Sequence, residues 1–208
     1  DRGIQNAEVL NFLFEHMDKP NFHLLEGNHE CHIRNFSESK QARSKEFERH
    51  TKIELESKGV SRKLVKKLCN KLKKAVFYTY GDKRVLVTHG GIVKIPTNLL
   101  TLSSEQMIRG VGDYNCLIDD LFTEHNDVST YQIHGHRNIH KLPIMAAERS
   151  FNLEGGIEQG GHLRIVTLDK NGFIPIEIKN NVVSARYEKV EQKKFNNKAF
   201  LDQLKNNR

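Results

Sequence analysis

Three short runs of apolar and β-branched residues each lead into a loop that carries histidine. They are the stretches FHLLEGNH, VLVTHGG and YQIHGH, which lie before or around residues 29, 89 and 136. A run of this kind, closed by glycine and a polar residue, is typical of a strand that delivers a loop. If the three strands share a sheet, their loops meet at one edge, where α/β sheets usually bind ligands. The sequence therefore predicts an α/β fold with a polar site at the strand ends.

The three loops supply nitrogen and oxygen donors that suit a metal ion. Asn28 and His29 follow the first run, His89 follows the second, and His134 or His136 follows the third. Imidazole nitrogens and amide oxygens are suitable ligands for manganese, iron or zinc. The pattern predicts a metal site and leaves open which histidine of the third loop faces it.

The cysteines argue against a disulfide scaffold and against a cysteine zinc site. There are three, and no two of them form a C-x-x-C pair: Cys31, Cys69 and Cys116. This usage fits a reducing cytoplasm. No apolar run approaches the roughly 18 residues of a membrane span, so we expect a cytoplasmic protein with no membrane partner.

The length of 208 residues suits one domain with a sizeable core. We predict that this domain covers residues 1–185, contains a helical insertion at about 37–76, and is followed by a basic tail or helix over 186–208. Hydrophobic spacing predicts a helix from residue 6 to 17. A charged helix is expected to begin at Ser37.

Two further segments are expected to be strands. The run Phe22 to Leu25 predicts a short strand before the first histidine loop. Between residues 149 and 179, two apolar runs separated by Lys-Asn-Gly predict an antiparallel hairpin. This hairpin would form a sheet edge or a second sheet.

The segment from Lys58 to Lys74 carries eight basic residues and no acidic one, which is enough to account for the whole formal excess of +7 in the chain. Its apolar residues Leu64, Leu68 and Leu72 recur every four positions, as on a helix with one buried face and one basic face. The basic face is either a solvated surface or a surface that attracts phosphate-bearing partners.

The stretches DRG, GNHE, THGG and HGH, in this order, resemble the motifs of the calcineurin-like metallophosphoesterases over roughly residues 1–170. The DRG and the Glu30 that follows His29 resemble the serine/threonine phosphoprotein phosphatase branch, including its bacterial and phage members. The resemblance implies a sandwich of two mixed β-sheets flanked by helices. It also implies two divalent metal ions, with manganese preferred to iron or zinc.

Carried over residue by residue, the resemblance makes Asn28, His89 and His136 ligands of the second metal. His136 is preferred to His134 because the family's ligand directly follows glycine. His29 would protonate the leaving oxygen of the substrate.

The remaining site residues follow from the same resemblance. Asp1 would hydrogen-bond His29 and keep it charged, and Arg2 would grip two phosphoryl oxygens. Glu154, in a stretch similar to the N-I-D-T-G of bacterial RNA-repair phosphatases, would orient a metal-bound histidine. Arg109 is the candidate for a second phosphate-binding arginine.

In the family, DRG ends a longer G-D-x-x-D-R-G motif, so the ligands of the first metal are expected upstream of Asp1. We therefore expect the 208-residue chain by itself to be inactive. The whole protein is expected to be a serine/threonine phosphatase-like phosphomonoesterase, in which a hydroxide shared by the metals attacks phosphorus and the substrate is a phosphoprotein. The alternatives are a polynucleotide or nucleotide phosphatase of RNA-repair type, and an inactive binding module of the same fold.

Overall fold

The computed structural model describes residues 1–182, and it confirms the predicted mixed α/β fold. A five-stranded mixed sheet has the order β1-β2-β3-β5-β4, with β2, β3 and β5 parallel and the two outer strands antiparallel to their neighbours. The five strands are β1 (Ala75–Tyr80), β2 (Lys83–Thr88), β3 (Thr130–His134), β4 (Met145–Ala147) and β5 (Ser150–Asn152).

A second sheet is the antiparallel hairpin of β6 (His162–Asp169) and β7 (Gly172–Lys179). Its turn is the predicted Lys-Asn-Gly, and Gly172 has a φ of +114°, which side chains other than hydrogen rarely allow. Val166 and Phe173 of this hairpin pack against the central sheet. The hairpin therefore covers one face of that sheet, as the prediction of a second sheet requires.

The central strands are buried on both faces because the hairpin covers one face and a helix the other, and neighbouring residues point to opposite faces. Val85 of β2 belongs to the core under the hairpin, whereas Leu86 belongs to a core with Phe122 on the other face. Phe122 lies on α6 (Ile118–His125). This layering holds the ends of β2 and β3, and thus the two histidine loops, in fixed positions.

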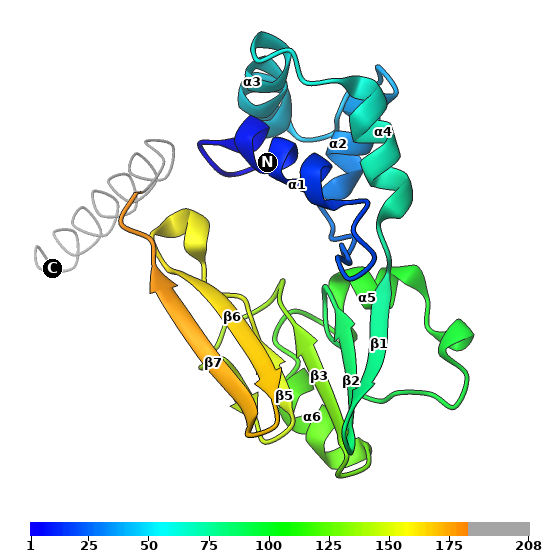
Figure 1. Ribbon diagram of the computed structural model, residues 1–208. Coiled ribbons are helices and arrows are strands. Elements are labelled where there is room, and N and C mark those ends of the chain that lie inside the picture. The colour runs from blue at the N-terminus through cyan, green and yellow to red at the C-terminus, as the bar shows by residue number, and fades with distance from the viewer. Residues whose placement is uncertain (183–208) are drawn as a thin grey trace, which may run out of the picture.

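The first part of the chain forms a helical unit beside the strand ends (Figure 1). Its buried apolar side chains form a core of their own, which includes Leu10, Phe36, Phe47, Leu55 and Leu68. The elements of this unit are α1 (Asn6–His16), α2 (Glu30–Ser37), the π-helix η1 (Phe47–Thr51), α3 (Lys52–Ser57) and α4 (Arg62–Lys71).

The predicted charged helix does not begin at Ser37. Ser37 ends α2, where its hydroxyl donates to the carbonyl of Arg34 at 2.7 Å. Helix α2 begins at Glu30, whose carboxylate accepts a hydrogen bond of 2.6 Å from the N–H of Gly27 and so holds the loop before the helix. The helix therefore begins at the residue that follows His29.

The predicted strand from Phe22 to Leu25 is reduced to one parallel bridge between Leu25 and Lys73. The N–H of Glu26 donates to the carbonyl of Lys73 at 2.8 Å, and that of Lys73 donates to the carbonyl of Leu24 at 2.9 Å. This bridge fixes the approach to Asn28 against the residues after α4.

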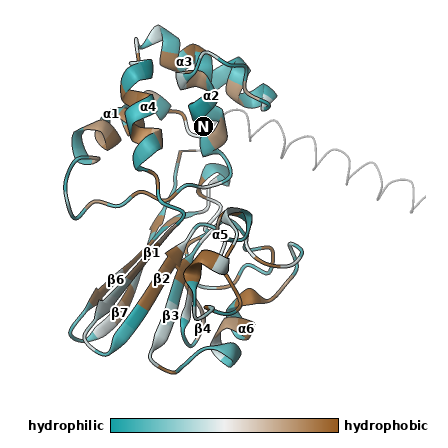
Figure 2. Ribbon diagram, turned by 90° about the vertical axis from the view of Figure 1, so that its right-hand side faces the viewer, coloured by the Kyte–Doolittle hydropathy of each residue, from teal (hydrophilic) through white to brown (hydrophobic). Residues whose placement is uncertain are grey.

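The basic segment forms α4 as predicted, and Figure 2 colours this helix in both hydrophilic and hydrophobic shades. Val65, Leu68 and Cys69 are its buried residues. Short helices complete the fold: η2 (Leu99–Thr101), α5 (Ser104–Arg109) and η3 (Ile157–Gln159). Within residues 1–182, no helix has the length and apolar character needed to cross a membrane. The predicted basic tail over 186–208 lies outside the described residues.

Candidate active site

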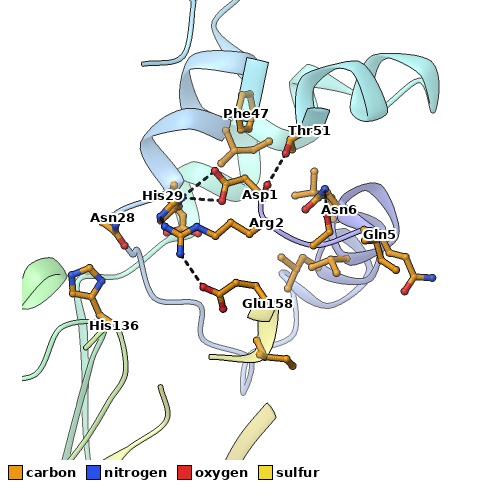
Figure 3. Close-up of a pocket in the computed structure, with 18 of the residues that line it drawn as sticks. Asp1, Arg2, Gln5, Asn6, Asn28, His29, Phe47, Thr51, His136 and Glu158 are labelled. Carbon is orange, nitrogen blue, oxygen red and sulfur yellow. Dashed lines mark hydrogen bonds and ion pairs between the residues drawn. The ribbon is translucent and has the colours of Figure 1, made fainter. Parts of the chain in front are cut away.

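A cavity of about 910 Å³ lies between the helical unit and the loops at the strand ends (Figure 3). Apolar side chains of α1, including Leu10 and Leu13, line one side of it. Polar side chains from the motif loops line the other, and they include seven of the predicted site residues: Asp1, Arg2, Asn28, His29, His89, His136 and Glu154.

Asn28, His89 and His136 converge from three separate loops. The Oδ1 of Asn28 lies 3.1 Å from Nε2 of His89, and the ring centroids of His89 and His136 are 5.0 Å apart. The N–H of Gly135 donates to the carbonyl of His89 at 3.0 Å, which ties the ends of β2 and β3 together. Gly27 is required here, because a Cβ at this position would lie 2.8 Å from Cε1 of His89.

His136 adopts an unusual backbone conformation, with a φ of +69°. Such a conformation is uncommon for residues other than glycine and needs support from its surroundings. The hydroxyl of Tyr114 donates to the carbonyl of His136 at 2.6 Å, and the centroids of their two rings are 5.6 Å apart. These contacts hold the imidazole toward the cavity.

Both imidazoles are neutral at physiological pH. Burial lowers the pKa of His89 to about 4, helped by the nearby His136. Burial likewise lowers the pKa of His136 to about 4, helped by the charges of Arg137 and Arg109. Neutral imidazole is the form that binds a metal, so these two rings and the amide oxygen of Asn28 fit one divalent cation.

The structure brings His136, and not His134, into the cavity. The Nε2 of His134 lies 2.8 Å from a carboxylate oxygen of Asp119, and both side chains are buried. The same carboxylate accepts a hydrogen bond of 2.5 Å from Ser150, whose own hydroxyl accepts one from Gln132. His134 thus belongs to a buried polar network inside the fold, and the preference for His136 as a ligand agrees with the geometry.

Asp1, His29 and Arg2 form a chain of contacts at the cavity wall (Figure 3). Nδ1 of His29 lies 3.0 Å from Oδ2 of Asp1, and Nη2 of Arg2 lies 2.8 Å from Nε2 of His29. A guanidinium has only donors, so Nε2 accepts the hydrogen bond, and Nδ1 carries the proton that is donated to Asp1. His29 is neutral in this arrangement.

The pKa of His29 agrees with the neutral form. Burial lowers it, and the charge of Arg2 lowers it further. The expectation that Asp1 keeps His29 charged is therefore not met here. The reason is that Arg2 occupies the ring nitrogen that a second proton would need.

Glu158 is a site residue that the sequence interpretation missed. Its Oε1 lies 3.0 Å from Nη1 of Arg2, so Arg2 bridges Glu158 and His29. Glu158 lies on η3, which is bounded by Gly156 and Gly160 in left-handed conformations. The Gly-Gly pairs on either side of Ile-Glu-Gln were the available signal, because paired glycines often mark a loop that approaches a site closely.

Glu154 lines the cavity, but its carboxylate accepts a hydrogen bond of 2.9 Å from the N–H of Gly156 in its own loop. Its proposed contact with a metal-bound histidine stays a prediction. Arg109 does not line this cavity: it ends α5 and pairs with Glu105. Its backbone packs against the second motif loop, since a Cβ on Gly90 would lie 2.9 Å from the nitrogen of Arg109.

Comparison with known proteins gives one match. A family model described as calcineurin-like phosphoesterase matches residues 1–154, which include all four motif stretches. No curated protein and no solved structure matches the chain.

Proposed function

Because the chain belongs to the calcineurin-like phosphoesterase family, a family of metal-dependent hydrolases, we propose that it acts on phosphate monoesters in the manner of the serine/threonine phosphoprotein phosphatases. The observation that carries this proposal is the contact between Arg2 and His29, at 2.8 Å, in the cavity that also holds Asn28, His89 and His136. A phosphate-binding cation and a proton donor beside one set of metal ligands are the parts that monoester hydrolysis needs.

Arg2 is the residue proposed to bind the phosphoryl group. Its planar guanidinium can donate two parallel hydrogen bonds to two phosphoryl oxygens. Its side chain is 43% exposed, and its present partners, Glu158 and His29, are within 3.0 Å. A phosphoryl group would replace the Glu158 carboxylate as the anion that Arg2 holds.

His29 is the residue proposed to protonate the leaving oxygen. Once Arg2 turns toward phosphate, Nε2 of His29 is released and the dianionic substrate favours its protonation. Asp1 accepts the hydrogen bond from Nδ1 and so stabilises the charged ring. Proton transfer from Nε2 then neutralises the departing alkoxide.

Bound divalent cations, with Mn²⁺ preferred, would activate the water nucleophile and neutralise phosphoryl charge. Asn28, His89 and His136 are the residues of this chain that would hold one of them. The cavity of about 910 Å³ has room for a phosphoryl group and the side chain that carries it.

The polynucleotide phosphatase alternative depends on the basic face of α4, and much of that charge is already paired. Asp18 forms ion pairs with Lys67 at 2.6 Å and with Lys71 at 2.8 Å. Glu26 pairs with Lys74 at 2.6 Å. The pairing lowers the net charge of this face, and no residue of α4 lines the cavity, so the face has no direct contact with the proposed site.

The test is hydrolysis of phosphoserine peptides, phosphorylated oligonucleotides and p-nitrophenyl phosphate, with Mn²⁺, by a version extended upstream with the family's first motifs. We expect peptide turnover, and a loss of about 100-fold in kcat/KM for Arg2→Lys, because a single point charge cannot replace the bidentate contact. The exposed Arg49→Lys is the control. Binding of inorganic phosphate without turnover of any substrate would favour the inactive binding module instead.

A further inference from the structure

A second group of side chains of the kinds that bind metals lies at the start of α2. Asp1, His29 and His32 each offer one ligand atom, and these three atoms all lie within 4.8 Å of one another. His29 and His32 are three residues apart at the first turn of the helix, so their rings fall on the same side of it. Their ring centroids are 5.8 Å apart.

His32 has no part in the hydrolysis proposed above, and it does not line the large cavity. Its ring packs 5.9 Å from the ring of the buried Phe47, which limits the positions that it can take. Asp1 is held from the same region, because the hydroxyl of Thr51 donates to its carbonyl at 2.8 Å. The three ligands are therefore held by separate contacts of the helical unit.

We infer that Asp1, His29 and His32 form a site for a zinc-type divalent cation, distinct from the set of Asn28, His89 and His136. Two imidazoles and one carboxylate, with a position left for water, are a donor set that suits Zn²⁺. Ligand atoms around one tetrahedral Zn²⁺ lie about 3.3 Å from one another. Small side-chain adjustments therefore fit the three to one cation, with Asp1 and His29 moving slightly apart from their present 2.9 Å.

Occupation of this site would remove the proton donor from the proposed reaction. The nitrogen of His29 beside Asp1 is Nδ1, at 2.9 Å from the carboxylate. A cation bound to Nδ1 leaves the ring proton on Nε2. Nε2 is then a donor, and it can no longer accept the hydrogen bond from Nη2 of Arg2. The cation thus captures both Asp1 and His29 and expels Arg2, so zinc at this site inhibits. This consequence, unlike the site itself, rests on the proposed function.

The site is tested by titrating the metal-free 208-residue chain with Co²⁺, followed by d–d absorption, and then displacing the Co²⁺ with Zn²⁺. Four proteins are compared: the unaltered chain, His32→Ala, His89→Ala, and His50→Ala as an exposed histidine control. We expect two classes of site in the unaltered chain and in the control. His32→Ala should weaken one class by roughly 10-fold or more, and His89→Ala should weaken only the other.

Binding curves for His32→Ala that match those of the control would overturn the inference. So would the loss of both classes on His89→Ala, since a single shared site would then explain the binding. Because α2 packs against α4, folding is checked by circular dichroism, and His32→Gln replaces His32→Ala if the latter does not fold. These readings need no turnover, so a failure of the zinc site is separate from a failure of the proposed hydrolysis.

Inhibition is then measured on the extended version, if it hydrolyses p-nitrophenyl phosphate with Mn²⁺. Each variant is compared with its own rate without zinc. Zinc should inhibit the unaltered enzyme and His50→Ala at the same concentration, and His32→Ala should need roughly 10-fold more zinc. Equal zinc sensitivity of His32→Ala and the control would refute the inhibitory role.

Discussion

Nη2 of Arg2 lies 2.8 Å from Nε2 of His29. The guanidinium proposed to bind phosphate therefore donates a hydrogen bond to the nitrogen that is proposed to protonate the leaving group. Arg2 also holds Glu158, through its other terminal nitrogen at 3.0 Å. The two contacts connect phosphate binding with protonation: a phosphoryl group that draws Arg2 away would at the same time release His29. The first two predictions follow from this connection.

Glu158→Gln should strengthen phosphate binding. The carboxylate competes with phosphate for Arg2, and its side chain is only 19% exposed, so solvent screens it incompletely. Loss of its charge should lower the KM for p-nitrophenyl phosphate and the Ki for inorganic phosphate by roughly 3-fold to 10-fold, with little change in kcat. The exposed Glu124→Gln, outside the cavity, is the control. A raised KM would mean that Glu158 holds Arg2 in the productive position and does not compete.

His29→Asn should discriminate between leaving groups. An alkyl phosphate needs a proton on its departing oxygen, so its kcat should fall by roughly 100-fold or more. p-Nitrophenolate leaves without a proton, so its hydrolysis should fall much less. Steady-state rates on both substrates, with metal content measured in parallel, test this. Equal losses on the two substrates, with metal retained, would remove His29 from the role of acid.

His134 and His136 are two residues apart but should behave in opposite ways. His134→Ala leaves the buried carboxylate of Asp119 with the Ser150 hydroxyl but without the imidazole, and should lower the free energy of unfolding by about 3 kcal/mol, while metal content stays the same. His136→Ala should reduce binding at the Asn28 and His89 site with a much smaller loss of stability. Urea unfolding and metal analysis of the dialysed proteins check both. If the two variants exchange these effects, His134 is the ligand.

The sequence predicted the parts of the fold that short-range patterns determine. The β-branched run that became β2 and the four-residue spacing in α4 are clear signals, and they have the predicted type. The start of α2 was missed because its N-cap is His29, which makes no side-chain capping hydrogen bond, so the usual Ser, Thr, Asp or Asn signal is absent. Ser37 has the composition of a helix start but lies at a helix end.

The motifs predicted that the loops of Asn28 and His89 would meet, and these two side chains lie 3.1 Å apart, while their role as metal ligands stays a prediction. The site was not predictable where a contact joins distant segments. Glu158 lies 156 residues from Arg2 in the chain, and only the packing of the hairpin sheet beside the helical unit brings them together. His32 was hidden for a similar reason, because its relation to Asp1 depends on the position of the chain before α1.

The metal-free protein should lose stability as the pH falls from about 6.5 to about 4. His89 and His136 have a pKa near 6.5 when unfolded and about 4 when folded, because burial disfavours their charged forms. In that interval the unfolded chain binds more protons than the folded chain, so acid favours unfolding. Urea unfolding in EDTA across this range measures the slope. His89→Gln should flatten the slope, and an unchanged slope would mean that His89 is not buried as described.

The last prediction concerns the substrate, and it uses the basic face of α4. If this face guided a nucleic acid, activity on a phosphorylated oligonucleotide would fall steeply with salt, because each neutralised phosphate releases counterions. Lys67 and Lys71, however, already pair with Asp18, while Lys63 and Lys66 are exposed. None of the four lysines lines the cavity, so replacing them with Gln should leave turnover of phosphoserine peptides unchanged and alter oligonucleotide turnover less than about 2-fold.

The matched variant is Asp18→Asn, which removes the partner of Lys67 and Lys71 and leaves their charges free. If α4 has a latent attraction for phosphate chains, this variant should increase oligonucleotide turnover at low salt and lose the increase at about 0.5 M salt, where the Debye length is only a few ångströms. Peptide turnover should not respond to either change. A large and selective loss of oligonucleotide turnover in the four-lysine variant, with a flatter salt dependence, would instead identify α4 as a nucleic-acid surface and make the polynucleotide phosphatase the better proposal.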